Sequence, residues 1–200
     1  MRIAFLCKRK YMGKDVILDR YARLYEIPYQ LARLGHEVRG YCFSYQNHSR
    51  GRWEHEALPG KLTWESGSAG FGYVAGLLIY PFNLKQRLGG FAPDVIIGAS
   101  DIPHVALGAW LAKRFEVPYV ADLYDNFESF GQARLPGMVA SLRRAVRDAA
   151  LVTTTSELLK EFVVQEYSAR GEVMAMPSTV DRQVFRPLDR LASRRALGLP

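Results

Sequence analysis

The stretch "PDVIIGASDIPHVALGAWLAKRFEVPYVADLYD", residues 93–125, has the pattern of a strand, a helix and a second strand. Residues 93–100 form an apolar run that proline opens and small residues close, which predicts a buried strand. Asp101 and Pro103 are typical of the start of a helix. Both strands are continuously apolar rather than alternating, so both faces of their sheet should be covered, as in parallel sheets.

The same alternation continues outward in both directions along the chain. An amphipathic helix is predicted over 16–35, kinked or split at Pro28 and stopped by Gly35. The sequence therefore predicts an α/β fold with a doubly wound, mostly parallel, Rossmann-like sheet of about seven strands. The strands are predicted at 2–7, 36–44, 61–66, 93–100, 117–125, 150–156 and 171–177. The remaining helices are predicted at 71–90, 102–115, 135–149 and 157–169.

Composition narrows the class of protein. The chain has 200 residues and a net charge of +7, which favours an anionic partner such as a phosphorylated ligand, an acidic lipid surface or a nucleic acid. We expect no nucleic-acid partner, because aromatic residues are not interleaved with the basic ones and no known module is visible. The two cysteines, Cys7 and Cys42, lie in apolar runs and fit a reducing cytoplasm. The opening "MRIAFLC" is too short an apolar run for a signal peptide.

Ligands of an open parallel sheet bind beyond the carboxyl ends of the strands. The loop after the first strand, "KRKYMGKD" (8–15), has neither G-x-G-x-x-G nor a P-loop, which argues against a dehydrogenase. Gly13 and Lys14 either let backbone N–H groups approach a phosphate or simply form a turn.

The loop after the fifth strand is the most unusual, because it places several polar side chains around Tyr124 and Phe127. These side chains are Asp122, Asp125, Asn126 and Glu128, and the carboxylates among them can hold sugar hydroxyls or act as a general base; alternatively Asp122 caps a turn and the others face solvent. Asp101 is either a helix cap or a ligand contact, and His104 is either packed or catalytic. No cluster of His, Cys and carboxylates has metal-ligand spacing, so neither a metal nor a cofactor is predicted.

A basic amphipathic helix follows this loop. Arg143, Arg144 and Arg147 share its polar side, and Arg134 precedes it. The three helix arginines either contact anionic lipid or form a solvated surface.

Five motifs in fixed order resemble a known family: "ARLGHEV" (32–38), "PDVIIGAS" (93–100), "VPYVADLYD" (117–125), "AALVTTTSE" (149–157) and "MPSTVDRQVFRP" (176–187). Together they resemble the N-terminal, acceptor-side half of GT-B glycosyltransferases of family four, which are retaining enzymes. In this resemblance Tyr124 replaces a histidine that contacts the donor sugar, and Ser178 and Thr179 replace Asn-Gly.

The resemblance implies transfer of a sugar from a nucleotide-sugar donor to the hydroxyl of a glycan or lipid-linked acceptor. Residues 1–183 would form the acceptor-side domain, and 184–200 a linker to a second domain that holds most of the donor. This half alone should be inactive, cytoplasmic, and in contact with the inner face of the membrane if the basic helix binds lipid. The implied roles are catalytic for Asp125 and Tyr124, acceptor-binding for Asp101, His104, Asn126, Glu128 and Arg134, and donor-phosphate contact for Gly13 and Lys14.

Two other functions fit the same pattern. One is a sugar-nucleotide epimerase of the non-hydrolysing type, which shares the GT-B architecture. The other is a non-catalytic module that binds a sugar or phosphate. An E-x7-E pair downstream would favour the transferase, and tight binding of free nucleotide by this chain alone would favour the binding module.

Overall fold

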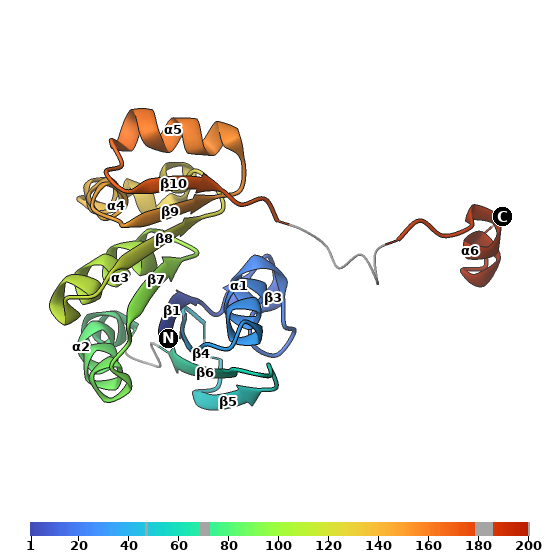
Figure 1. Cartoon of the computed structure of the whole chain (residues 1–200), viewed down its shortest axis with the longest axis horizontal. Coiled ribbons are helices and arrows are strands. Elements are labelled where there is room, and N and C mark those ends of the chain that lie inside the picture. Colours follow the sequence, from blue (N-terminus) through green and yellow to red (C-terminus); the bar gives the residue numbers. More distant parts are fainter. Residues whose placement is uncertain (47, 69–72, 179–185, 200) are drawn as a thin grey trace.

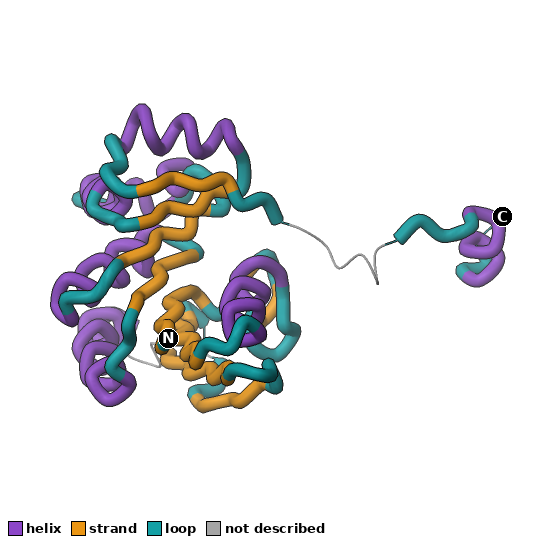
Figure 2. The backbone as a smooth tube through the Cα atoms, viewed as in Figure 1, coloured by secondary structure: helices purple, strands orange, loops and turns teal. Residues whose placement is uncertain are grey.

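A computed structural model describes the chain except residues 47, 69–72, 179–185 and 200. One twisted sheet runs through it in the strand order β10-β9-β8-β7-β1-β4-β6-β5 (Figures 1 and 2). The strands of this sheet are β1 (Arg2–Lys8), β4 (Glu37–Ser44), β5 (Gly51–His55), β6 (Lys61–Ser68), β7 (Val95–Ala99), β8 (Tyr119–Leu123), β9 (Leu151–Thr154) and β10 (Glu172–Ala175). The α-helices are α1 (Ala22–Arg33), α2 (Tyr73–Phe91), α3 (Ile102–Phe115), α4 (Met138–Arg147), α5 (Glu157–Tyr167) and α6 (Arg190–Ala196).

The strand order has a topological switch point between β1 and β7. From β1 the chain builds the sheet outward through β4 and β6, then returns to the other side of β1 to begin β7. All neighbouring strands of this sheet pair in parallel except β5 and β6, which pair antiparallel. The seven predicted strands are confirmed. The eighth, β5, lies between the strands predicted at 36–44 and 61–66, in a stretch for which no strand was predicted.

Both faces of the sheet are covered, as the apolar strands predicted. The residues that point to one face pack with α3 and α4, and those on the other face pack with α1. Figure 1 shows α1 on the side of the sheet opposite α3. The alternation of faces along β1 is clear, because Leu6 belongs to the first cluster, whereas Phe5 and Cys7 belong to the second.

The first helix is shorter than predicted. It begins at Ala22, and the preceding apolar residues Val16 and Ile17 are buried in the connecting loop. Pro28 lies inside α1 without splitting it. Gly35 has φ +93°, the left-handed conformation expected just after a helix end, and its N–H donates to the Ala32 carbonyl.

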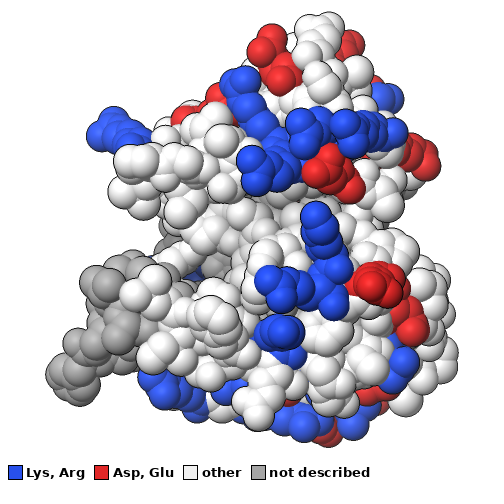
Figure 3. All heavy atoms as spheres, turned by 90° about the vertical axis from the view of Figure 1, so that its left-hand side faces the viewer, with Lys and Arg blue, Asp and Glu red and all other residues white. Residues whose placement is uncertain are grey.

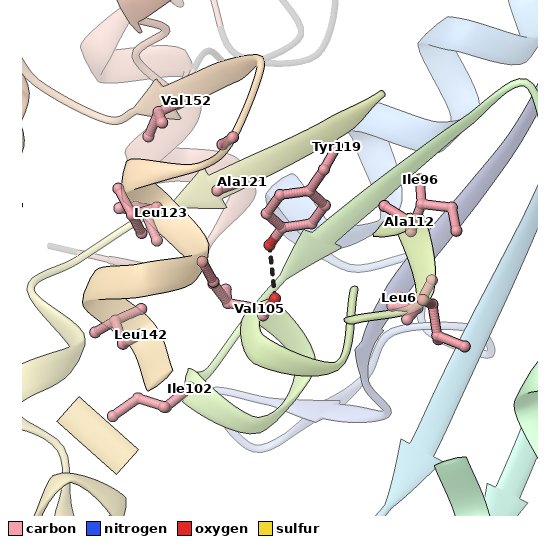
Figure 4. Packing of buried hydrophobic residues seen from close by; sticks show 14 of the residues in the cluster. Leu6, Ile96, Ile102, Val105, Ala112, Tyr119, Ala121, Leu123, Leu142 and Val152 are labelled. Carbon is pink, nitrogen blue, oxygen red and sulfur yellow. Dashed lines mark hydrogen bonds between the residues drawn. The ribbon is translucent and has the colours of Figure 1, made fainter. Parts of the chain in front are cut away.

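The β7–α3–β8 unit is packed backbone to backbone. A Cβ on Gly98 would lie 2.9 Å from the His104 carbonyl oxygen, and one on Gly108 would lie 2.9 Å from the Tyr119 ring. Tyr119 reaches from β8 to α3, where its hydroxyl donates to the Val105 carbonyl at 2.7 Å (Figure 4). Because Gly98 and Gly108 have no side chain, α3 can lie close to the end of β7.

The loop after β1 is a small hairpin. β2 (Lys10–Tyr11) and β3 (Lys14–Asp15) pair antiparallel around a Met12–Gly13 turn, and both turn residues have positive φ. Buried Arg9 fixes the hairpin, because its Nε donates to Asp15 at 2.9 Å and its guanidinium lies 4.7 Å from the Trp53 ring.

The last helix, α6, stands away from the sheet in Figure 1. The predicted boundary between 183 and 184 lies outside the described residues, as does Thr179. Within the part of the chain that the structure describes, no helix is long and apolar enough to cross a membrane.

Candidate functional site

The switch point brings together the carboxyl ends of β1, β7 and β8. Lys8 ends β1, and its backbone N–H donates to the Ser100 hydroxyl at 2.8 Å. Ser100 is fully buried directly after β7 and has φ +83°, which is strained for a residue other than glycine. Its unusual backbone turns the carbonyl toward the loop that follows β8.

Tyr124, the first residue after β8, connects these elements. Its hydroxyl donates to the Ser100 carbonyl at 2.9 Å and accepts a hydrogen bond from Lys8 Nζ at 3.0 Å. Lys8 Nζ also lies 5.5, 5.6 and 5.9 Å from the centroids of the Tyr11, Tyr124 and Phe130 rings. We call Lys8, Tyr11, Ser100, Tyr124 and Phe130 the Lys8 cluster.

Burial changes the acid–base behaviour of this cluster. Desolvation raises the pKa of Tyr124, so its phenol stays protonated at neutral pH. Desolvation lowers the pKa of Lys8, although the Asp101 carboxylate partly opposes the shift. Tyr124 is therefore a neutral hydrogen-bonding group, and its hydroxyl is bonded to Lys8 Nζ and to the Ser100 carbonyl.

Asp101 is the helix cap that the sequence suggested. Its Oδ1 accepts from the His104 backbone N–H at 3.1 Å, and His104 Nδ1 lies 2.5 Å from the same oxygen. Tyr45 donates to the other carboxylate oxygen at 3.0 Å. Burial alone would raise the pKa of Asp101, but His104 lowers it below its ordinary value. Asp101 and His104 are 1% and 2% exposed, which supports the packed reading of the histidine and leaves their predicted acceptor contacts a prediction.

A second polar cluster lies beneath the rim. Arg23 from α1 reaches the buried Asp122 at the end of β8, with Nη2 to Oδ1 at 2.6 Å and Nε to Oδ1 at 3.0 Å. Thr153 Oγ1 donates to the same carboxylate at 2.6 Å, and Arg23 Nη1 donates to the Met176 carbonyl at 2.5 Å. This Asp122 cluster ties α1 to β8, β9 and the end of β10, and its charges are matched within the protein.

A pocket of about 320 Å³ has Tyr124 in its lining. It lies between the loop after β8 and the start of α5, and we call it the β8 pocket. Asp125 is exposed at its edge, and Asn126 caps the short 3₁₀ helix that follows by accepting the Glu128 N–H at 3.0 Å. The pocket is lined by Tyr124, Asp125, Asn126, Thr155, Ser156, Leu158, Leu159 and Phe162.

The remaining predicted site residues lie outside the Lys8 cluster and do not line the β8 pocket. Glu128 accepts two hydrogen bonds from Arg143, at 2.7 and 3.0 Å, and these bonds lower its pKa. Arg147 pairs with Asp148 at 3.1 Å, whereas Arg144 is exposed. Figure 3 views the side where α2, α3 and α4 lie and shows basic side chains with acidic ones beside them. Glu128 is thus already engaged by a neighbouring helix, and its acceptor role stays a prediction.

Arg134 and Lys14 are exposed and outside the Lys8 cluster. Gly13 has open space where a Cβ would stand, so the positive φ of the hairpin turn is sufficient reason for a glycine there. Its phosphate contact stays a prediction. In the described residues there is no group of three or more His, Cys, Asp or Glu side chains placed to hold a metal ion.

Sequence reasoning missed the two cations that organise the site. Lys8 and Arg23 stood in the sequence as ordinary basic residues of a loop and a helix. One signal pointed to Lys8, because it is the last residue of the first strand and therefore at the switch point. Nothing local marked Arg23, whose partner Asp122 is far away in the sequence.

Comparison with known proteins identifies the family of this chain. Residues 22–179 match the family described as "Glycosyl transferase 4-like domain", and the chain belongs to this family. No curated protein matches the sequence. The resemblance to a domain of family-four GT-B glycosyltransferases is thereby confirmed.

Solved structures of low sequence identity share the fold. Sucrose-phosphate synthase from Thermosynechococcus elongatus has a TM-score of 0.74 at 14% identity, over 100% of this chain and 53% of that one. Anabaena HepE in complex with UDP has a TM-score of 0.62 at 17% identity, over 99% of this chain and 50% of that one. The UDP-GlcNAc 2-epimerase from Methanocaldococcus jannaschii has 0.57 at 12% identity, over 88% and 45%. The chain spans about half the length of these structures.

Proposed function

We propose that this chain is the acceptor-side part of a glycosyltransferase that moves a sugar from a nucleotide-sugar donor to an acceptor hydroxyl. The observation that carries the proposal is the place of Tyr124 and Asp125, which follow β8 beside the switch point and border the β8 pocket. Ligands of this sheet class bind at that edge. Membership of the glycosyl transferase 4-like family makes sugar transfer the reaction that we propose for this edge.

The surroundings of Asp125 and Tyr124 suggest a different role for each residue. Asp125 is exposed at the pocket edge, where its carboxylate can accept a hydrogen bond from a sugar hydroxyl. Tyr124 is neutral, and its hydroxyl is hydrogen-bonded to Lys8 and Ser100, so it would form a fixed part of the wall of the β8 pocket. Tyrosine in place of the family histidine supplies shape and a hydrogen bond rather than a proton-transfer group near neutral pH.

We propose that most of the binding site for the nucleotide-sugar donor lies outside this chain. The solved relatives are about twice as long as this chain, and HepE was solved with UDP. We propose residues 1–183 as the acceptor-side domain and 184–200 as the connection to a nucleotide-sugar domain. Retention of the anomeric configuration and transfer of a hexose are part of the same proposal. We propose that the enzyme works in the cytoplasm on a glycan or lipid-linked acceptor.

The proposal is tested with the 200-residue chain and with a complete enzyme that contains it. The chain alone should release no nucleotide from UDP-sugars, and turnover by it would overturn the division of labour. In the complete enzyme, Asp125→Asn should lower kcat at least about tenfold while the melting temperature stays nearly constant, because an exposed carboxylate contributes little to stability. A lowered melting temperature with unchanged turnover would assign Asp125 to structure.

A sugar-nucleotide epimerase is the second candidate, because one of the solved relatives is a UDP-GlcNAc 2-epimerase. The two functions differ in product: the transferase requires an acceptor, whereas the epimerase converts the nucleotide sugar alone. Incubating the complete enzyme with UDP-GlcNAc and no acceptor separates them.

Peripheral lipid contact through Arg143, Arg144 and Arg147 is a separate proposal. Because Arg143 and Arg147 already have acidic partners, Arg144 would be the main contributor. Cosedimentation with anionic vesicles tests it, since changing all three to glutamate should abolish the binding.

A further inference from the structure

Lys8 differs from the two buried arginines, Arg9 and Arg23. Arg9 has Asp15 at 2.9 Å, and Arg23 has Asp122 at 2.6 Å. For Lys8, no carboxylate of the described residues lies within the 4.0 Å of an ion pair, and its hydrogen-bond partner there is the neutral Tyr124 hydroxyl. Burial makes an unpaired charge costly, and Lys8 is half-buried, so its lack of an ion pair calls for an explanation.

The nearest acid does not supply that reason. Asp101 is close enough to affect Lys8 electrostatically, but its oxygens are taken by His104 and Tyr45. The three aromatic rings around Nζ, each within 6 Å, stabilise positive charge without neutralising it. Among the described residues, the ammonium group of Lys8 therefore has ring contacts and a neutral hydrogen-bond partner but no ion pair.

The donor capacity of Lys8 points to the same conclusion. A lysine ammonium has three N–H donors, and the hydrogen bond to Tyr124 uses one of them. Tyr124 also donates to the Ser100 carbonyl, so the lysine is held from a fixed point. Two donors on a positioned cation suit an anion with several oxygens.

We propose that the Lys8 cluster is a phosphate-binding subsite, in which a phosphate group of a substrate pairs with Lys8. The inference rests on the proposed function and sharpens it. It moves the phosphate contact from the hairpin tip, where Gly13 and Lys14 were predicted, to the hairpin base at the switch point. The phosphate has two chemical sources, a phosphorylated sugar acceptor and the diphosphate of the donor.

The experiment is a calorimetric titration of the 200-residue chain at low salt and neutral pH. The probes are inorganic phosphate, glucose 6-phosphate with glucose as its control, and UDP with uridine as its control. Wild type is compared with Lys8→Met, with Lys8→Arg, and with Lys10→Met. The Lys10 variant is the matched control, because it removes one lysine charge from the same hairpin at an exposed position.

Lys8→Met should weaken phosphate binding at least tenfold, whereas Lys10→Met and Lys8→Arg should change it less than threefold. Loss confined to glucose 6-phosphate assigns the subsite to the acceptor, and loss confined to UDP assigns it to the donor. Equal weakening by Lys8→Met and Lys10→Met would reduce the effect to general electrostatics and overturn the proposal. Undetectable binding of every phosphate probe by folded wild type also overturns it.

Two additional controls keep the result interpretable. Near-ultraviolet circular dichroism verifies that each variant is folded. If Lys8→Met does not fold, Tyr124→Phe replaces it, because this change removes the hydroxyl that positions Lys8 and should weaken phosphate binding at least threefold. Binding is measured without turnover, so failure of the subsite leaves the transferase proposal standing, and the reverse also holds.

Discussion

The Asp122 cluster and the Lys8 cluster lie at the same edge of the sheet, yet they treat a cation in opposite ways. Arg23 is buried and donates to the Asp122 carboxylate and to the Met176 carbonyl, and the same carboxylate also accepts from Thr153. Lys8 is half-buried and held by aromatic rings and a phenol, with no ion-pair partner among the described residues. The comparison separates a cation that holds the fold together from one whose counter-charge is left to a ligand.

The largest effect in this comparison is expected from Asp122→Asn. The change leaves Arg23 buried without its matching charge, which should lower the free energy of unfolding by about 3–5 kcal/mol. Urea denaturation measures it. The double variant Arg23→Met, Asp122→Leu is the control and should recover part of the loss. A loss below about 1 kcal/mol would show that Arg23 finds water or another partner, and the contrast with Lys8 would disappear.

Tyr124→Phe probes the connection between Lys8 and Ser100. It removes the donor to the Ser100 carbonyl and the acceptor for Lys8 Nζ, so we expect a loss of about 1–3 kcal/mol in the free energy of unfolding. The same denaturation assay measures it, with Tyr21→Phe as a matched control because Tyr21 lies nearby at 6.1 Å from the Tyr11 ring. Equal stability of Tyr124→Phe and wild type would mean that water replaces both hydrogen bonds.

Lys8→Met should change the free energy of unfolding by less than about 1 kcal/mol. The variant loses a hydrogen bond and the ring contacts, but it also removes the cost of desolvating an unpaired ammonium. The contrast with Asp122→Asn is therefore large at two positions on the same edge of the sheet. A loss as large as that of Asp122→Asn would identify Lys8 as a structural cation.

The pH dependence of the same variant sharpens the comparison further. Burial lowers the pKa of Lys8 below its ordinary 10.5, with Asp101 and Cys7 opposing the shift and Tyr11 and Tyr124 facing the ammonium. Between the lowered folded-state pKa and 10.5, the unfolded chain binds more protons at Lys8. The Lys8 contribution to the free energy of unfolding therefore rises with pH in that window.

This rise is read from the stability of wild type minus that of Lys8→Met, which cancels the groups common to both. The difference should move in favour of wild type as the pH approaches 10.5. Movement in the opposite direction would mean that the protein stabilises the ammonium form without any ligand.

The smallest effect is expected at the surface pair of Glu128 and Arg143. Arg143→Gln should cost less than about 1 kcal/mol, because solvent screens the pair and the side chains are 21% and 44% exposed. The contribution is present above the ordinary pKa of glutamate and is lost as the pH falls through the lowered pKa of Glu128. Thermal melts near neutral pH measure it, and a loss above about 2 kcal/mol would place this pair with the buried clusters.

Most of the fold could be predicted from the sequence, and the site only partly. The apolar runs around 93–125 predicted α3 and its two strands because buried parallel strands leave a strong local signal. β5 was missed because an edge strand alternates charged residues with Trp53 and reads as a polar loop. Lys8 and Arg23 were missed because their roles depend on partners such as Tyr124 and Asp122, brought close only by the parallel crossovers.

The antiparallel β5 has a consequence for the protein in concentrated solution. A parallel sheet ends in rows of unpaired backbone groups, onto which a neighbouring molecule can add a strand. β5 is itself one edge of the sheet and presents exposed Arg52 and Glu54 to solvent, and the four-residue β10 at the other edge begins with exposed Glu172. Short, charged borders disfavour strand exchange between molecules, so the sheet stops growing at eight strands instead of polymerising.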